Sequence, residues 1–164
     1  MMAAGEYYIF TGREVVLPRH VTHVRIDKSL TVIPARAFHA HPNITELVCH
    51  DGVIKVVEEW AFDQCPSLRR VIMPGVKEVE ENVFYECKAL MDVECGKLEI
   101  IGEGAFDHCY SLRSIDLSSV MTVEELAFYY CRSLTNIKFG DKLNQSERGH
   151  SVIAPLWSES QSHC

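Results

Sequence analysis

The sequence lacks any long apolar run and any cluster of basic residues at its start. No segment approaches the ~18 consecutive apolar residues that a membrane-spanning helix needs, so we expect no membrane span. The opening residues, MMAAGEYYIF, contain no lysine or arginine, and Glu6 interrupts them before an apolar core of signal-peptide length is reached. We therefore expect the protein in the cytoplasm or another intracellular compartment.

Basic charge is also scarce. The chain has 16 lysine and arginine residues against 23 aspartate and glutamate residues, which gives a formal net charge of −7. A nucleic acid partner requires a basic face for its phosphates, so we expect no nucleic acid binding.

Motifs of catalysis and metal binding are missing from the sequence as well. It contains no Walker loop, no G-x-S-x-G, no G-x-G-x-x-G and no H-E-x-x-H, and its eight histidines are scattered. We expect no catalytic residue, no metal site and no cofactor, and hence no enzyme.

What the chain does contain is a repeat. Five phenylalanines follow one another at spacings of 24, 22, 22 and 22 residues: Phe38, Phe62, Phe84, Phe106 and Phe128. Three residues after these come His41, Cys65, Cys87, Cys109 and Cys131. Apolar residues recur in phase five positions before each phenylalanine and six, nine and eleven positions after it. Agreement at so many positions predicts one structural unit repeated along a globular chain, with the phenylalanines and cysteines as a structural ladder.

The sequence of each repeat predicts one strand and one turn. In LRSIDL and its counterparts, apolar residues alternate with polar ones, which is typical of a strand with one buried face. The segment EEWAFDQC has Glu, Ala and Phe at helix-turn spacing, so we expect a short helical turn there. A single unit cannot bury its apolar edge alone. The predicted fold is therefore an α/β solenoid with a parallel β-sheet on the concave face and short helical turns on the convex face.

The repeated motif resembles a known family. AFDHCYSLRSIDL is similar to the BspA-type, or Treponema-like, leucine-rich repeats, and the resemblance covers about residues 21–142. The phrases VTHVRID, MPGV and DLSSV also resemble the members found in diatoms and other protists. The resemblance implies a protein-binding or adhesion surface, and it implies no catalytic residue within the motif.

The repeat divides the chain into three parts. We expect an N-terminal cap at residues 1–20, a leucine-rich repeat array of about six coils of 22–24 residues at 21–143, and an irregular tail or imperfect cap at 144–164. The Ala-Phe-x-x-Cys motif does not recur after Phe139. The last coil is thus expected to be uncapped, with Phe139 and its strand edge open to self-association.

The repeated cysteines admit four interpretations. Zinc ligands commonly come as C-x2-4-C pairs, whereas these cysteines lie 22 residues apart. A disulfide between neighbouring coils satisfies the distance requirement, but in-phase side chains point the same way and the expected compartment is reducing. A nucleophile needs an electropositive, partly exposed site, and only Cys109 follows a histidine. The interpretation we favour is structural, because free cysteine behaves as a small buried side chain.

Glutamates recur just before the apolar pair of each unit: Glu58, Glu59, Glu80, Glu81, Glu103, Glu124 and Glu125. The interpretation we favour places them in the first turn of each short helix, where exposed N–H groups attract negative charge. The alternative is a docking edge for a basic partner or for calcium. The Gly-Asp-rich nonapeptide pattern of calcium-binding repeats is absent.

Partner specificity is expected at the outward positions of the concave sheet, since the core does not constrain them. These are His23, Arg25, Glu46, Val48, Arg70, Ile72, Asp92, Glu94, Ser114, Asp116, Asn136 and Lys138. Val48 and Ile72 are apolar and lie beside Arg70, a combination that suits an interface anchor. The alternative is an ordinary solvated sheet.

The sequence therefore predicts a non-catalytic protein–protein interaction module or scaffold whose partner is another protein. A thiol-based redox or enzymatic protein and a cell-surface adhesion module are the two alternatives.

Overall fold

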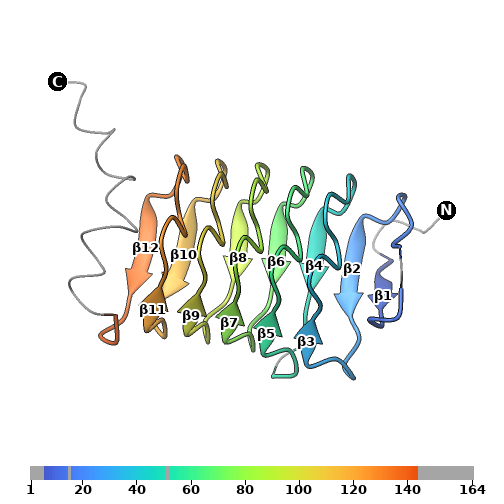
Figure 1. Ribbon diagram of the computed structural model, residues 1–164, viewed down its shortest axis with the longest axis horizontal. Helices are drawn as coiled ribbons and strands as arrows, with labels where there is room; N and C mark the ends of the chain where they lie inside the picture. The colour runs from blue at the N-terminus through green and yellow to red at the C-terminus, as the bar shows by residue number, and fades with distance from the viewer. Residues whose placement is uncertain (1–5, 15, 51, 144–164) are drawn as a thin grey trace.

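The protein folds as a solenoid built from two stacks of parallel strands (Figure 1). The computed structural model describes residues 6–14, 16–50 and 52–143. Within these residues it contains twelve strands and no helix. The coils follow one another in a row from β1 to β12 (Figure 1).

The first stack holds the longer strands in the order β1-β2-β4-β6-β8, followed by a separate pair, β10-β12. Their bounds are β1 Tyr8–Phe10, β2 His23–Ile26, β4 Glu46–Val48, β6 Arg70–Ile72, β8 Asp92–Glu94, β10 Ser114–Leu117 and β12 Asn136–Phe139. The second stack runs in the order β3-β5-β7-β9-β11. Its two-residue strands are β3 Val32–Ile33, β5 Val56–Val57, β7 Glu78–Val79, β9 Ile100–Ile101 and β11 Thr122–Val123.

The register of the strands follows the sequence repeat. Leu47 pairs with Val71, and Val71 pairs with Val93, so equivalent residues of successive units lie side by side in parallel strands. Leu47 and Val71 are completely buried, while the residues on either side of them are exposed or partly exposed. The prediction of parallel strands with one buried face, repeated as a solenoid, is confirmed.

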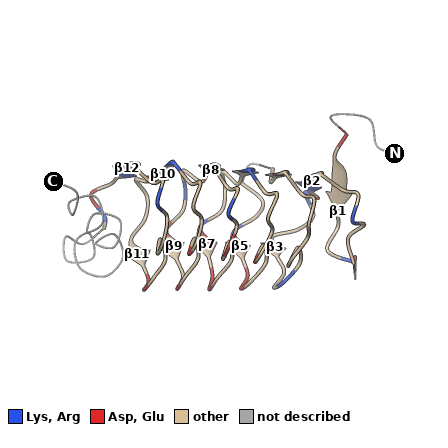
Figure 2. Ribbon diagram, turned by 90° about the horizontal axis from the view of Figure 1, so that it is seen from above, with Lys and Arg blue, Asp and Glu red and all other residues tan. Residues whose placement is uncertain are grey.

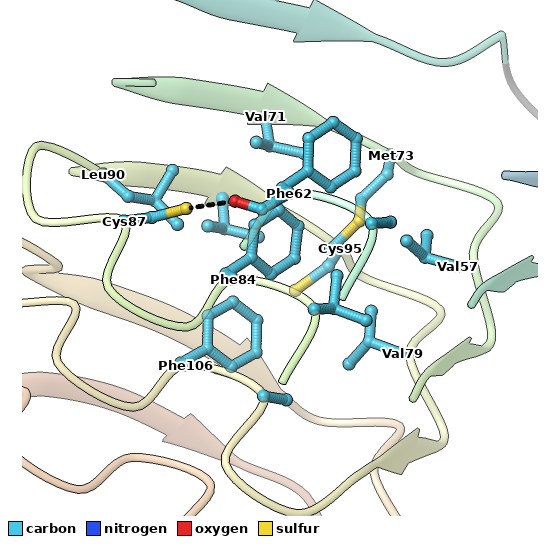
Figure 3. Packing of buried hydrophobic residues seen from close by; sticks show 14 of the residues in the cluster. Val57, Phe62, Val71, Met73, Val79, Phe84, Cys87, Leu90, Cys95 and Phe106 are labelled. Carbon is cyan, nitrogen blue, oxygen red and sulfur yellow. Dashed lines mark hydrogen bonds between the residues drawn. The ribbon is translucent and has the colours of Figure 1, made fainter. Parts of the chain in front are cut away.

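The core is a column of phenylalanine rings, three of which are seen in Figure 3. From Phe38 to Phe128, neighbouring ring centroids are 4.9, 5.2, 5.1 and 5.3 Å apart, with interplanar angles of 7°, 9°, 17° and 3°. Phe10 closes the N-terminal end of the column, tilted by 55° against Phe38. Aromatic pairs of this kind add about 0.5–1.5 kcal/mol each to the stabilisation that burial provides.

The predicted short helical turns are wrong, because each unit has an irregular six-residue turn in their place. In the turn at residues 59–64, Phe62 N donates to the carbonyl of Val83 in the next coil, 2.9 Å away. The N–H groups two residues before and two residues after Phe62 also bond to the next coil, and those between them bond to the carbonyl three residues back. In an α-helix every N–H bonds to the carbonyl four residues back, so the alternating pattern is incompatible with a helix.

This alternating pattern requires left-handed backbone at two positions of each turn. Trp60 and Gln64 have φ values of 59° and 54°. The equivalent residues with positive φ in the other turns are Arg36, Ala40, Asn82, Glu86, Gly104, His108, Leu126 and Tyr130. A residue with a Cβ atom loses roughly 1–2 kcal/mol in this region, a cost that the hydrogen bonds between coils offset.

The glutamates before the turns bind the backbone of the preceding coil. Three such bonds are present: Ala35 N to Glu58 Oε2 at 2.9 Å, Glu59 N to Glu80 Oε2 at 3.1 Å, and Glu103 N to Glu124 Oε2 at 3.1 Å. The placement of these residues in the first turn of a helix is therefore wrong, since the described residues contain no helix. Each carboxylate instead satisfies an N–H group in the coil before it.

The N-terminal residues extend the first stack by one strand. β1 pairs with β2 in parallel and places Ile9 beside Arg25, and both Phe10 and Leu17 are buried. The boundaries of the cap at 1–20 and of the array at 21–143 stay predictions. The predicted tail at 144–164 lies outside the described residues.

Replacement of Phe106 by alanine should lower the free energy of unfolding by about 3–5 kcal/mol, because it leaves a cavity inside the ring column. Urea unfolding followed by circular dichroism measures this change. Met121→Ala is the matched control, since Met121 is 43% exposed and its truncation should change the free energy by less than about 0.5 kcal/mol. Equal effects of the two substitutions would show that the column is not a main source of stability.

Candidate binding face and buried thiols

The outward side chains of the first stack lie on one surface, which we call the sheet face. It comprises His23, Arg25, Glu46, Val48, Arg70, Ile72, Asp92, Glu94, Ser114, Asp116, Asn136 and Lys138, all exposed or partly exposed. In each strand, two of these residues flank the inward-pointing residue. The structure thus brings the predicted positions together on one side of the stack, while their role in binding stays a prediction.

Tyr7 organises the N-terminal end of the sheet face. Its ring lies edge-on to His23, with centroids 5.6 Å apart, and the guanidinium of Arg25 lies 4.5 Å from its centroid. The hydroxyl of Tyr7 donates a hydrogen bond to Glu46, and this bond is the largest cause that raises the pKa of Tyr7. These four side chains therefore form one connected group.

The middle of the sheet face combines apolar side chains with an arginine. Val48 and Ile72 pair in register, and both are partly exposed. Arg70 Nη2 lies 2.6 Å from Glu94 Oε1, and the two side chains are 46% and 55% exposed. An ion pair this exposed contributes only about 0–1 kcal/mol. Arg70 is therefore available to a partner at low cost.

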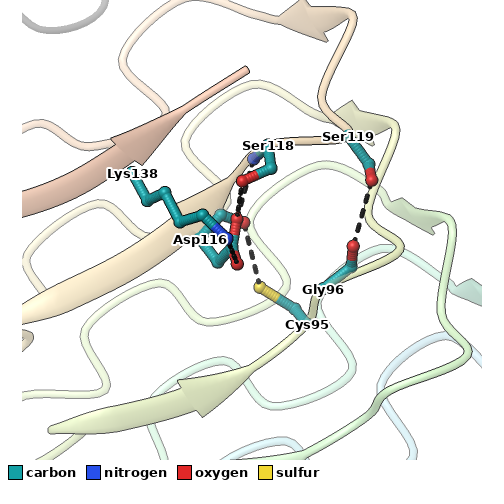
Figure 4. Close-up of polar contacts among 6 residues, drawn as sticks. All are labelled: Cys95, Gly96, Asp116, Ser118, Ser119 and Lys138. Carbon is teal, nitrogen blue, oxygen red and sulfur yellow. Dashed lines mark hydrogen bonds and ion pairs between the residues drawn. The ribbon is translucent and has the colours of Figure 1, made fainter.

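The first stack is interrupted between β8 and β10, which follow each other along the array without being hydrogen-bonded. At the previous junction Met73 N donates to the carbonyl of Glu94 at 2.9 Å. At the interruption the equivalent contact is a thiol bond from Cys95 Sγ to the carbonyl of Asp116, at 3.9 Å (Figure 4). Glu94 and Asp116 occupy equivalent positions one repeat apart, and like charges on facing strands destabilise pairing.

Polar side chains bind one another around this interruption (Figure 4). Asp116 accepts hydrogen bonds from Ser118 N at 2.9 Å and from Lys138 Nζ at 3.1 Å, and it also accepts one from the Ser118 hydroxyl. The bond from the Ser118 hydroxyl is the largest cause that lowers the pKa of Asp116. Ser119 Oγ donates to the carbonyl of Gly96 at 3.0 Å. The Ser119 bond and the thiol bond of Cys95 therefore cross the interruption between β8 and β10, while the Lys138 bond joins β10 to β12.

A shallow cleft of about 400 Å³ lies at this point of the sheet face. It is lined by Arg70, Asp92, Val93, Glu94 and Ser114. Among the described residues the Asp92 carboxylate makes no hydrogen bond or ion pair, whereas Glu94 is paired with Arg70. The cleft therefore offers one carboxylate without a hydrogen bond, Asp92, beside Arg70 and above Val93, which is 8% exposed.

The four repeated cysteines bind the preceding coil through their thiols, as Figure 3 shows for Cys87 and Phe62. The thiol bonds are Cys65 Sγ to Phe38 O at 3.0 Å, Cys87 Sγ to Phe62 O at 3.0 Å, Cys109 Sγ to Phe84 O at 3.2 Å and Cys131 Sγ to Phe106 O at 3.0 Å. In the first unit His41 takes the place of the cysteine, and its Nε2 lies 3.1 Å from the carbonyl of Pro18. The side chain at this position thus supplies a polar contact as well as volume.

Burial keeps the described thiols protonated. It raises the pKa of Cys49, Cys65, Cys95 and Cys131 to about 12, and that of Cys87 and Cys109 well above the ordinary value. All six are free and buried, and Cys164 lies outside the described residues. Because the thiolate is the reactive species, these six side chains are poor nucleophiles and poor metal ligands.

Residues 6–14, 16–50 and 52–143 contain no group of three or more His, Cys, Asp or Glu side chains placed to hold a metal ion. No helix with the length and apolar character needed to cross a membrane occurs among them either.

Sequence reasoning missed the aromatic side chains of the turns. Tyr85, Tyr129 and Tyr130 lie one or two residues after a core phenylalanine, and His108 lies two residues after Phe106. All four are partly exposed. The signal was available in the sequence, since these positions read Tyr-Glu, Asp-His and Tyr-Tyr in the last three units.

The comparisons with known proteins show the family. Residues 31–149 match the family described as "BspA type Leucine rich repeat region", with six copies of the repeat. The chain therefore belongs to this family of leucine-rich repeat proteins, which typically serve as cell-surface or protein-interaction modules. No curated protein matches the chain.

Solved structures share the fold. The T. pallidum leucine-rich repeat protein has a TM-score of 0.59 and 20% identity, covering 89% of this chain and 81% of its own. A leucine-rich repeat protein from Eubacterium ventriosum has a TM-score of 0.64 and 21% identity, over 76% of this chain but only 33% of its own. A leucine-rich cell surface protein from Faecalibacterium prausnitzii has a TM-score of 0.57 and 22% identity, over 74% and 40%.

Stability should fall steeply above pH ~9, where thiols of the unfolded chain lose their protons. The folded-state pKa of Cys65 is raised to about 12, so the unfolded chain ionises first and is favoured as the pH rises from about 9 to about 12. In this range each buried thiol lowers the free energy of unfolding by about 1.4 kcal/mol per pH unit. Below about pH 8 the thiols add no pH dependence.

Urea unfolding from pH 7 to pH 10.5 measures this slope. Cys109→Ala should reduce the slope of the free energy of unfolding against pH by the contribution of one thiol, because alanine does not titrate. A free energy of unfolding that stays flat up to pH 10.5 would contradict buried, protonated thiols.

Proposed function

We propose that this protein is a non-catalytic interaction module that binds another protein through its sheet face. The observation that carries the proposal is the set of twelve outward side chains that the first stack presents on one side. Since the core does not constrain these positions, they are free to match a partner. Membership of a family of interaction modules supports the same conclusion.

Two parts of the sheet face suit the anchoring of a partner. Val48 and Ile72 give adjacent apolar surface, and the loosely paired Arg70 borders it. Arginine and large apolar side chains are enriched where interfaces derive most of their affinity. The neighbouring cleft adds the exposed carboxylate of Asp92, which makes no hydrogen bond to the described residues and favours a basic side chain on the partner.

A thiol-based activity finds little support in the described residues. All six described cysteines are buried and protonated, and each repeated cysteine donates its thiol to a backbone carbonyl. A redox or nucleophilic role needs an accessible thiolate. The thiols are better explained as parts of the junctions between coils.

Cell-surface adhesion is a second candidate function. It is favoured by the fold shared with the F. prausnitzii protein, which is described as a leucine-rich cell surface protein. We favour an intracellular location, since the six cysteines in the described part of the chain are free, which suits a reducing compartment. Fractionation of the native cells separates the two locations.

Two finer predictions rest on the sequence alone. One is the relation to diatom and protist proteins, whereas the three solved structures described above are from bacteria. The other is self-association through the last coil, where Phe139 is 37% exposed at the end of β12.

The sheet face is tested by affinity capture from an extract of the native cells. The bait is the chain with Val48→Asp, Ile72→Asp and Arg70→Glu combined. We expect it to capture at least about tenfold less of each partner that the unchanged chain captures. The substitutions replace the apolar anchor by negative charge. Unchanged capture would remove the sheet face as the binding surface.

A matched control lies on the second stack, where Val32, Val56 and Glu78 are partly exposed and aligned in register. The combination Val32→Asp, Val56→Asp and Glu78→Arg introduces similar changes away from the sheet face. Capture should survive in this control, and thermal unfolding of both variants checks that the fold is kept. Equal losses in both would point to damage of the fold and not to a binding face.

A further inference from the structure

The six-residue turns carry a second surface, separate from the sheet face. We call its side chains the aromatic strip: Trp60, Tyr85, His108, Tyr110, Tyr129 and Tyr130, all partly exposed. They come from four successive units of the repeat. The strip therefore runs along the array and not around one coil.

His108 lies at the centre of the aromatic strip. Its ring centroid is 5.8 Å from that of Tyr85, 5.5 Å from Tyr110, 6.2 Å from Tyr129 and 4.8 Å from Tyr130. These contacts are edge-to-face or tilted, so ring faces and edges point in several directions. Asp107 Oδ1 holds His108 Nδ1 at 2.7 Å and fixes the imidazole in place.

Both ends of the aromatic strip already hold a guanidinium group. Arg36 lies 5.5 Å from the Trp60 ring, and Arg132 lies 5.0 Å from Tyr130 and 5.5 Å from Tyr110. Within the described residues no such cation lies over Tyr85, which sits between the two ends. These contacts show that the rings of the strip accept guanidinium groups. The Tyr85 ring, in the middle of the strip, has no guanidinium over it among the described residues.

A row of exposed carboxylates begins the same turns, and one of them, Glu81, accepts a hydrogen bond from Asn82 Nδ2 at 2.9 Å. We call this row the glutamate ladder: Glu59, Glu81, Glu103 and Glu125, all exposed. Figure 2 shows acidic segments recurring from coil to coil beside the short strands of the second stack. None of the four carboxylates forms an ion pair with any described residue. The core rings of these coils are 5.1–5.3 Å apart, so like charges recur at short intervals.

Asp63 carries a buried acceptor atom that the described residues leave without a hydrogen-bond donor. It is 2% exposed, and its Oδ2 pairs with His39 Nδ1 at 2.9 Å. Its other carboxylate oxygen, Oδ1, is buried and has no hydrogen-bond partner. Gln64 N, next to Asp63 in the sequence, donates to the carbonyl of Tyr85 at 2.8 Å, so the turn of Asp63 lies against the turn of Tyr85. An unsatisfied acceptor therefore lies next to the uncovered part of the aromatic strip.

We propose that the turns bind an extended, arginine-bearing segment of a partner protein. Its guanidinium groups lie on the aromatic strip between Arg36 and Arg132, and its remaining cationic side chains face the glutamate ladder. Arginine is favoured over lysine, because the planar guanidinium stacks on aromatic faces and is more weakly hydrated than an ammonium group. This site and the sheet face use different side chains, so either one can exist without the other.

The test measures the binding of octa-arginine and octa-lysine to the whole chain by calorimetry at two ionic strengths. We expect octa-arginine to bind about fivefold tighter, an advantage that the aromatic faces supply. An octa-citrulline peptide keeps the planar shape without the charge and should not bind. Equal affinity for arginine and lysine peptides, or binding of citrulline, would overturn the proposal.

Two variants test separately how much the aromatic rings and the carboxylates contribute to peptide affinity. Tyr85→Leu with Tyr129→Leu should abolish the preference for arginine while weak, salt-sensitive binding of both peptides persists. Glu59→Gln, Glu81→Gln, Glu103→Gln and Glu125→Gln combined should weaken both peptides about tenfold or more and keep the preference for arginine. The glutamine variant changes only exposed side chains, so it keeps the test valid where the leucine variant does not fold.

The matched control has the same change in net charge away from the turns: Glu6→Gln, Glu78→Gln, Glu99→Gln and Asp141→Asn. Its peptide affinity should stay within about twofold of the unchanged chain. An equal loss in this control and in the glutamate-ladder variant would show attraction to the overall negative charge and no site on the turns. The sheet face is intact in all these variants, so the outcome is independent of the proposed function.

Discussion

In the first four six-residue turns every second N–H group bonds to the next coil, and the rest of the structure depends on this arrangement. It draws successive turns together, so that Phe62 and Phe84 stack at 5.2 Å in the core. It also brings each cysteine within reach of a carbonyl one coil back, as with Cys87 and Phe62 at 3.0 Å. The cost is positive φ at residues such as Trp60 and Asn82, which the bonds between coils offset.

The same arrangement sorts the side chains of a unit into two groups. Those that face the column, such as Phe84 and Cys87, are completely buried and determined by packing. Those that alternate with them in the strands and turns point outward and are free to vary. The sheet face and the aromatic strip are both made of such outward positions, in the strands and in the turns respectively. A repeat protein of this kind therefore gains two surfaces from one set of core constraints.

The sequence was sufficient to predict the stacked parallel strands and the outward positions beside residues such as Leu47, because their period matches the pleat of a strand. It did not predict the second stack, since strands of two residues such as Val56–Val57 are too short to show alternation. The helical turn was predicted wrongly because the spacing of Glu59, Ala61 and Phe62 fits a helix as well as the observed turn. The break beside Glu94 and the contacts of His108 depend on neighbouring coils, which one unit's pattern does not report.

The interruption between β8 and β10 also matters for how the array comes apart. In a repeat protein, stability is close to a sum of unit terms and of couplings between neighbours. At this junction the coupling rests on the second stack, the turns and a few side chains, while the other junctions also have paired backbones in the first stack. The array therefore behaves as two cooperative blocks joined at a seam, and local opening begins at the seam and not at a random coil. The cleft beside Asp92 lies on that seam, so a partner bound there would hold the two blocks together.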